Sequence, residues 1–255
     1  MKKMPILFVG HGSPMNAIED NEYSKQWSEL GNQITKPEAI LAVSAHWYTH
    51  GIFTSDVSDP KLVYDMYGFP EELYQVKYDV KGSPEVADLT KDLIGDSVKV
   101  DNSWGIDHGA WSVLKHIYPN ADIPVVQLSI DGNSSAASHY RLGQKIASLR
   151  ESGVMILGSG NVVHNLGRVN WGMKGGYDWA MEFDNYIKSS ILAGNHEDVI
   201  HYENAGASAR PAFPTPEHFY PLLYVLGASD PEDKITVFND SCTLGSMSMT
   251  GYLFE

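Results

Sequence analysis

Cysteine is almost absent from this chain of 255 residues, which contains a single one, Cys242. One thiol excludes an intramolecular disulfide and a metal centre built from several thiolates. This cysteine usage fits a reducing compartment, so we expect a cytoplasmic protein. Long apolar runs are also missing. The stretch at residues 6–9 is too short for a signal peptide, and none approaches the ~20 apolar residues of a membrane helix.

Basic residues are scarce as well: 18 lysines and arginines stand against 32 acidic residues, giving a net charge of −14. Such a surface repels polyanions, so nucleic acid and anionic membranes are excluded as expected partners. Hydrophobic residues at 43% and charged residues at 20% are typical of a globular protein with a full core. The length fits one large α/β domain or at most two small ones. Because no repeat or linker divides the sequence, we expect a single domain over residues 1–255.

Short β-rich runs alternate with longer helical runs, which predicts an α/β domain. The predicted strands cover residues 6–9, 40–44, 125–130 and 154–158, and the predicted helices cover residues 23–30, 84–93, 111–117, 138–150, 179–192 and 217–226. Ser83 and Thr215 are expected to cap helix starts, and Gly153 and Gly227 to follow helix ends. Residues 195–215 are polar and irregular, which predicts a long surface loop near a site.

Four of the ten histidines stand where predicted elements meet. His11, His46 and His164 follow predicted strands, and His218 lies at the start of a predicted helix. In α/β sheets, ligand sites form beyond the carboxyl ends of strands, and neutral imidazole is the commonest protein metal ligand. A single histidine in such a place is more often a hydrogen-bonded structural residue. Four together favour a shared metal site, whereas the structural role is expected for His50, His116, His139, His196 and His201.

Two further patterns bear on the chemistry. Gly10 and Gly12 flank His11, and small residues there allow a tight turn and a close approach of substrate. In Asp107-His108-Gly109 the carboxylate either orients the imidazole for acid–base work or simply caps the following helix. Oxygen-activating Fe(II) sites often combine two histidines with a carboxylate, so the third ligand is either Glu217 or His218. The G-x-S-x-G and H-E-x-x-H motifs are absent.

Five sequence blocks in this order resemble the class III extradiol ring-cleavage dioxygenases, and most closely the 4,5-DOPA extradiol dioxygenase family. The resemblance runs from about Pro5 to Met249, nearly the whole chain. The blocks are Gly10-His11-Gly12-Ser13-Pro14, Ser44-Ala45-His46-Trp47, Asp107-His108-Gly109, Gly158-Ser159-Gly160-Asn161-Val162-Val163-His164-Asn165 and Pro214-Thr215-Pro216-Glu217-His218.

The resemblance implies a single α/β domain with a mixed central β-sheet flanked by helices. It implies a divalent metal on His11, His46 and His218, with His164 at or next to the metal. It also implies acid–base roles for His108 and His164. The more distant protocatechuate-type members use a carboxylate as third ligand. An all-histidine site suits Zn(II) as well as the Fe(II) that ring cleavage requires.

The implied reaction is cleavage of a DOPA-like catechol by O2, giving a seco-DOPA or betalamic-type product. Trp47, Tyr48 and Trp111 either wall the aromatic ring or belong to the core. Two other functions stay open at this point. One is a zinc hydrolase acting on an amide or ester. The other is a non-enzymatic interaction protein on the same scaffold, as in the Memo family. The acid–base residues His108 and His164 speak against the second.

Overall fold

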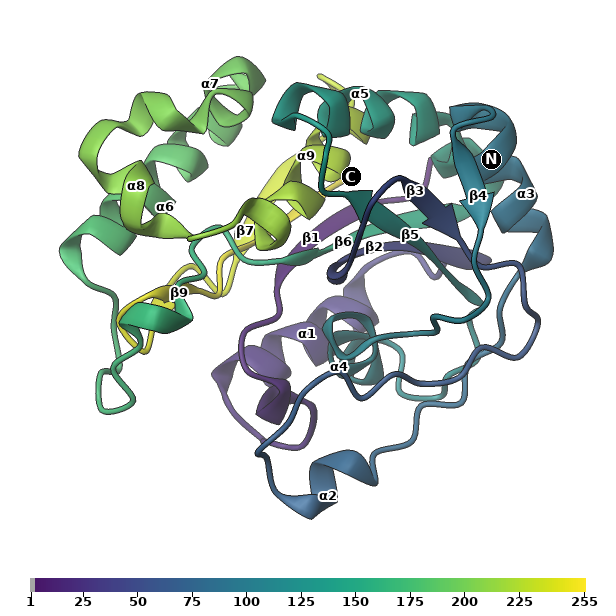
Figure 1. Ribbon diagram of the computed structural model, residues 1–255, viewed down its shortest axis with the longest axis horizontal. Helices are drawn as coiled ribbons and strands as arrows, with labels where there is room; N and C mark the ends of the chain where they lie inside the picture. The colour runs from purple at the N-terminus through teal and green to yellow at the C-terminus, as the bar shows by residue number, and fades with distance from the viewer. Residues whose placement is uncertain (1–2) are drawn as a thin grey trace.

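One mixed sheet forms the centre of the molecule, with the strand order β4-β3-β5-β2-β6-β1-β10-β7 (Figure 1). The structure, a computed structural model, describes residues 3–255. The inner four strands are parallel, and β10 pairs antiparallel with both β1 and β7. Their bounds are β1 (Ile6–Gly10), β2 (Ala39–Thr49), β3 (Ile52–Thr54), β4 (Val98–Val100), β5 (Val125–Asp131), β6 (Val154–Gly160), β7 (Ile235–Phe238) and β10 (Gly251–Phe254). The expected single α/β domain with a mixed sheet is confirmed.

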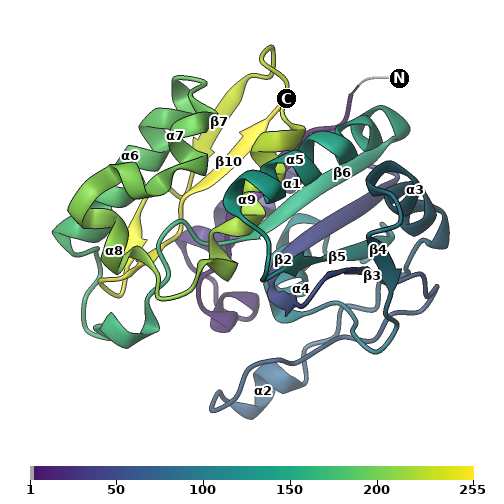
Figure 2. The same ribbon diagram turned by 45° about the horizontal axis from the view of Figure 1, so that its top comes forward.

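Helices cover both faces of this sheet (Figures 1 and 2). Alternate strand residues point to opposite faces, so Ile6 and Phe8 join one core and Leu7 and Val9 the other. The first core includes α3 (Pro84–Ile94), α5 (Ala136–Ile146), α6 (Asp178–Leu192) and α9 (Tyr220–Ala228), and the second includes α1 (Glu22–Gln33) and α4 (His108–Ile117). The inner strands are therefore buried on both sides, which explains their nearly continuous apolar sequences.

The predicted strands and helices are all present, but the one predicted loop is wrong. Residues 195–215 are not a long irregular loop. They contain α7 (His196–Ile200), a 3-10 helix (Tyr202–Ser208) and α8 (Ala209–Ala212). This segment folds because its few apolar side chains, including Val199 and Ala212, are buried in the core. Within residues 3–255, no helix has the length and apolarity needed to cross a membrane.

The expected helix ends are partly confirmed. The Ser83 side chain accepts a hydrogen bond from the Val86 amide and caps α3, and Gly153 follows a helical segment with a left-handed φ of 81°. Thr215 makes no capping bond. Gly227 lies inside α9, not beyond it. A Cβ atom there would lie 2.1 Å from the Tyr140 carbonyl oxygen, so the glycine serves the close packing of α9 on α5.

Candidate active site

Three parallel strands, β1, β6 and β2, lie side by side and end at the same edge of the sheet. His11 follows β1 directly, and its amide donates to the Gly160 carbonyl at the end of β6 (3.0 Å). Gly12 then turns the chain with a φ of 63°, as the flanking glycines predicted. The His11 Nδ1 atom lies 3.0 Å from the Ser159 hydroxyl, which itself donates to the Gly109 carbonyl. That hydroxyl therefore accepts from the imidazole, which leaves the lone pair of His11 on Nε2.

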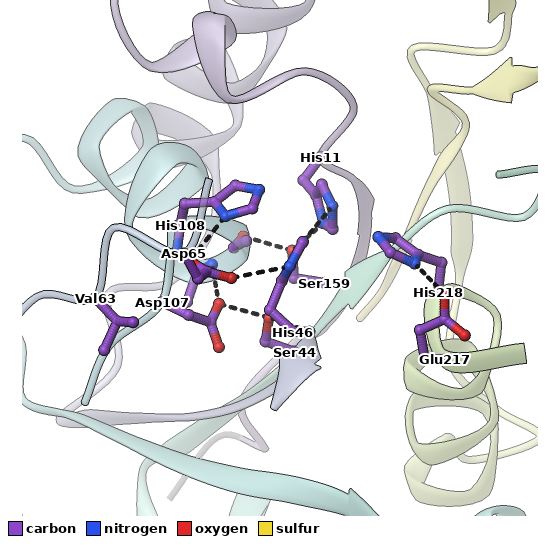
Figure 3. A network of polar contacts seen from close by, with 12 residues as sticks. His11, Ser44, His46, Val63, Asp65, Asp107, His108, Ser159, Glu217 and His218 are labelled. Carbon is purple, nitrogen blue, oxygen red and sulfur yellow. Dashed lines mark hydrogen bonds and ion pairs between the residues drawn. The ribbon is translucent and has the colours of Figure 1, made fainter. Parts of the chain in front are cut away.

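His46 lies within β2 and not beyond its end, which corrects the predicted strand boundary at residue 44. Pairing of β2 with β5 changes register between Val43 and Tyr48, so the strand continues through an irregularity around His46. The His46 Nδ1 atom lies 2.9 Å from an oxygen of Asp65, and its Nε2 atom lies 3.2 Å from Nε2 of His11 (Figure 3).

His218 ends a 3-10 turn (Pro216–His218) before α9. The Asn161 amide donates to the His218 carbonyl (2.8 Å), and a Cβ atom at Gly160 would lie 2.0 Å from this oxygen. The glycine therefore allows the turn to reach the end of β6. His218 Nδ1 contacts Glu217 Oε1 at 3.2 Å. Its Nε2 atom is buried with no hydrogen-bond partner among residues 3–255.

The three rings form a nearly equilateral cluster, which we call the histidine trio: His11, His46 and His218. Their centroids are 5.1 to 5.3 Å apart, and their ligand atoms lie within 4.8 Å of one another. His164 is close by but outside the trio. Its ring stacks on His218 with centroids 3.5 Å apart and an interplanar angle of 8°. Glu217, His218 and His164 make a second group of possible ligands.

His108 is the first residue of α4 and faces the trio, with its ring centroid 3.9 Å from that of His46. Asp107 caps α4 through the Ala110 amide, and it also accepts from Ser44 and Gln127. The capping alternative is thus confirmed. The carboxylate on the imidazole is that of Asp65, 2.8 Å from His108 Nδ1, which sequence reasoning missed. In the sequence, Asp65 is marked only as an acidic residue among aromatic residues in the connection between β3 and α3.

Burial and mutual repulsion keep most of these rings uncharged. Burial, with the neighbouring histidines, holds the pKa of His11 and of His218 well below the ordinary value, and the pKa of His164 at about 4. Burial and His46 also lower the pKa of His108. For His46 burial acts in the same sense, but the contacts with Asp65 and the nearby charges of Asp107 and Glu217 together outweigh it and raise the pKa. Neutral rings present lone pairs, the form in which histidine binds metal.

The trio opens into a cavity of about 390 Å³. Its outer wall is largely apolar, and Tyr67 and Trp171 stand at the rim with 91% and 78% of their surfaces exposed. Of the two alternatives for Trp47, Tyr48 and Trp111, the aromatic wall does not hold, because none of them lines the cavity. Trp47 stacks on Trp104 and Trp111 is fully buried, so both belong to the core. Other residues of this apolar wall include Met66, Phe69, Leu166, Val169, Leu244 and Met247.

The donor set fits a divalent metal. In each ring of the trio Nδ1 already has an oxygen partner, so Nε2 is left for the metal. This arrangement is usual around metal-bound histidines, where the second nitrogen donates to a carboxylate or another oxygen. The orphaned Nε2 of His218 is the strongest sign, because a buried polar atom without a partner is costly unless something else satisfies it.

Comparison with known proteins agrees with this chemistry. The family model for the catalytic LigB subunit of aromatic ring-opening dioxygenase matches residues 5–255. A 4,5-DOPA dioxygenase extradiol of Escherichia coli (strain K12) is 44% identical, over 97% of this chain and 93% of that protein. The protein of the same name from Beta vulgaris is 40% identical, over 97% and 95% of the two chains.

A solved structure shares the fold over nearly the whole length of the chain. The crystal structure of an uncharacterized protein from Escherichia coli K12 superposes with a TM-score of 0.87 and 41% identity, covering 99% of this chain and 100% of that one. The family match spans almost the whole chain and includes every histidine of the site. This chain therefore belongs to the LigB family of aromatic ring-opening dioxygenases and is an extradiol dioxygenase.

Proposed function

We propose that this protein opens the ring of a catechol with O2, using one divalent metal held by His11, His46 and His218. The histidine trio carries the proposal: three buried nitrogens face one another, and each ring is fixed from behind by an oxygen. Glu217, the alternative third ligand, contacts His218 Nδ1 and so serves as an orienting partner. His164 stacks on His218 instead of joining the trio, which supports an acid–base role over that of a fourth ligand.

Fe(II) is the metal we propose for the reaction. When bound, it supplies the redox chemistry that O2 activation requires, and Zn(II) has none to offer. The protein would hold the substrate's two oxygens near the trio. Both atoms of O2 enter the product, the bond between a hydroxylated ring carbon and its unhydroxylated neighbour breaks, and a semialdehyde acid results.

Two histidines are placed to move protons during this reaction. His164 is neutral because burial keeps its pKa at about 4, so it is ready to accept the proton of a catechol hydroxyl. His108 is held at Nδ1 by Asp65, which leaves its Nε2 to take up a proton and return it later, after O2 has reacted. A general acid or base in such a place typically accelerates a reaction by ~10²–10⁴-fold.

We further propose a DOPA-like catechol as substrate. The cavity has an apolar outer wall suited to an aromatic ring, and relatives at 44% and 40% identity are named for 4,5-DOPA. The ring-opened product of DOPA is able to close again through its amine. We therefore expect a yellow betalamic-type compound from DOPA and a yellow semialdehyde from a simple catechol.

The test is anaerobic reconstitution with Fe(II), followed by O2 uptake against a panel of catechols. We expect stoichiometric O2 uptake with the iron-loaded protein and none with the zinc-loaded protein. Hydrolysis of esters or amides by the zinc-loaded protein, with no reaction of the iron-loaded protein toward catechols, would instead establish the hydrolase. Iron loading without any turnover of catechols would favour the interaction protein.

A further inference from the structure

One carboxylate is shared by two of the histidines. The Oδ2 atom of Asp65 lies 2.9 Å from His46 Nδ1, and its Oδ1 atom lies 2.8 Å from His108 Nδ1. The same Oδ1 accepts the backbone amide of His108 at 3.0 Å. Figure 3 shows Asp65 between the two rings. Its side chain is 14% exposed, so water competes little for these bonds.

Asp65 reaches this place through backbone pairing and not through its sequence neighbours. Leu62 bridges to Ile106 in parallel, the Val63 amide donates to the Ile106 carbonyl (2.8 Å), and the Trp111 indole donates to the Val63 carbonyl (3.0 Å). This pairing fixes residues 62–63 beside the start of α4. Asp65 follows two residues later and meets His108 there.

We propose that Asp65 is a positioning residue that fixes the tautomers of His46 and His108 together. A carboxylate only accepts, so both Nδ1 atoms must carry their hydrogens, and both Nε2 atoms are then free. The Nε2 lone pair of His46 is then directed at the proposed metal, and the Nε2 lone pair of His108 at the reacting proton. The proposal rests on the roles assigned above to His46 and His108. It adds that one side chain sets both, so that loss of its carboxylate changes at least one of the two tautomers.

The decisive variant is Asp65→Asn. A carboxamide has a single accepting oxygen, so it serves only one Nδ1–H, and its NH2 group faces the other ring. That ring must change to the tautomer with hydrogen on Nε2. If it is His46, zinc affinity falls, by about 10–100-fold as for other partners of metal-bound histidines. If it is His108, zinc stays bound and the proton-transfer atom is blocked. Asp107→Asn is the matched control, because Asp107 bonds neither ring.

The measurement is ¹⁵N NMR of the full-length, zinc-loaded protein labelled at histidine, with signals assigned through single His→Gln variants. Wild type should show Nδ1–H at both rings, and Asp65→Asn should show Nε2–H at one of them or a weakened zinc titration. Asp107→Asn should keep both wild-type tautomers. Neither catechol nor O2 is present, so failure of ring cleavage does not affect the outcome.

Two results would overturn the proposal. The first is a hydrogen on Nε2 of His46 or of His108 in the wild-type protein. This result does not depend on whether any variant folds. The second is an Asp65→Asn protein that keeps both Nδ1–H tautomers and binds zinc within ~3-fold of wild type, short of the ~10–100-fold loss expected when a partner of a metal-bound histidine is removed. Thermal unfolding of each variant shows whether a change in zinc affinity arises from loss of the fold.

Discussion

Asp184 is a buried carboxyl group in α6, 3% exposed, that accepts hydrogen bonds from the hydroxyls of Ser248 and Thr250. Those two residues lie on either side of Met249, whose backbone packs against Gly10, and the preceding Met247 lines the cavity. Burial raises the pKa of Asp184 from 3.8 to about 6 despite the two hydroxyl donors. The folded state therefore favours the protonated acid, so the stability of the protein depends on pH.

The sign and size follow from proton linkage. Because the pKa is higher in the folded than in the unfolded chain, this stabilisation is complete below pH 3.8 and is lost as the pH rises through about 6. The two values differ by about 2, and each unit is ~1.4 kcal/mol, so ~3 kcal/mol is lost in all. About half of that loss falls between pH 5 and pH 8. In Asp184→Asn the loss is absent.

The assay is urea unfolding of wild type and Asp184→Asn, each followed at pH 5 and at pH 8. Relative to wild type, the variant should gain ~1.5 kcal/mol over that interval, whatever constant cost its altered hydrogen bonds add. Taking the difference removes groups that titrate in both proteins, such as His139, whose lowered pKa of about 4 gives stability that is lost as the pH falls. A difference constant to within ~0.5 kcal/mol would refute the reasoning, since Asp184 would then be charged in the fold.

Three further predictions concern the site. His11→Ala and His46→Ala should each lose most bound metal by elemental analysis, and wild-type content in both would remove them from the metal site. His108→Ala and His108→Gln should keep their affinity for iron and catechol, yet turn over ~10²–10⁴-fold more slowly. Loss of iron would show that His108 is a metal ligand. Unchanged turnover would show that His108 is a structural residue. Among residues 3–255 no lysine or arginine lines the cavity, and Arg168, which precedes the lining residue Val169, lies over Trp179. The carboxylate of DOPA therefore gains no ion pair in the cavity, and dopamine, which lacks that carboxylate, should show a kcat/KM within ~3-fold of the value for DOPA; a loss of ~10-fold or more would contradict this.

The sequence was sufficient to predict the inner strands and the meeting of the histidines. Strands buried on both faces are short apolar runs between polar or glycine residues, and such runs are visible without a structure. Once the strands were parallel, His11 after β1 and His164 after β6 had to lie at one edge of the sheet. The outer strands were not predicted, because β3, β4, β7 and β10 have three or four residues each, too few for a clear alternating pattern.

Asp65 escaped prediction for a different reason. It lies in a long connection without periodicity, and only the pairing of residues 62–63 with Ile106 brings it to the histidines. Asp107 stands next to His108 in sequence, but its side chain turns toward Ser44 and Gln127. Adjacency in sequence therefore pointed to the wrong carboxylate. Local motifs identify the candidate metal ligands, whereas the residues that orient those ligands come from distant parts of the sequence.

The positions of Asp65 and Glu217 also bear on why three neutral histidines suffice here. The more distant protocatechuate-type enzymes use a carboxylate as the third ligand, which offsets part of the charge of a divalent metal. In this chain two carboxylates instead contact the outer nitrogens of His46 and His218. Each would lie one imidazole away from the proposed metal, and together the two carboxylates would offset the two positive charges of a divalent ion. A buried cation needs such compensation, and supplying it through imidazoles would leave the inner positions to catechol and O2.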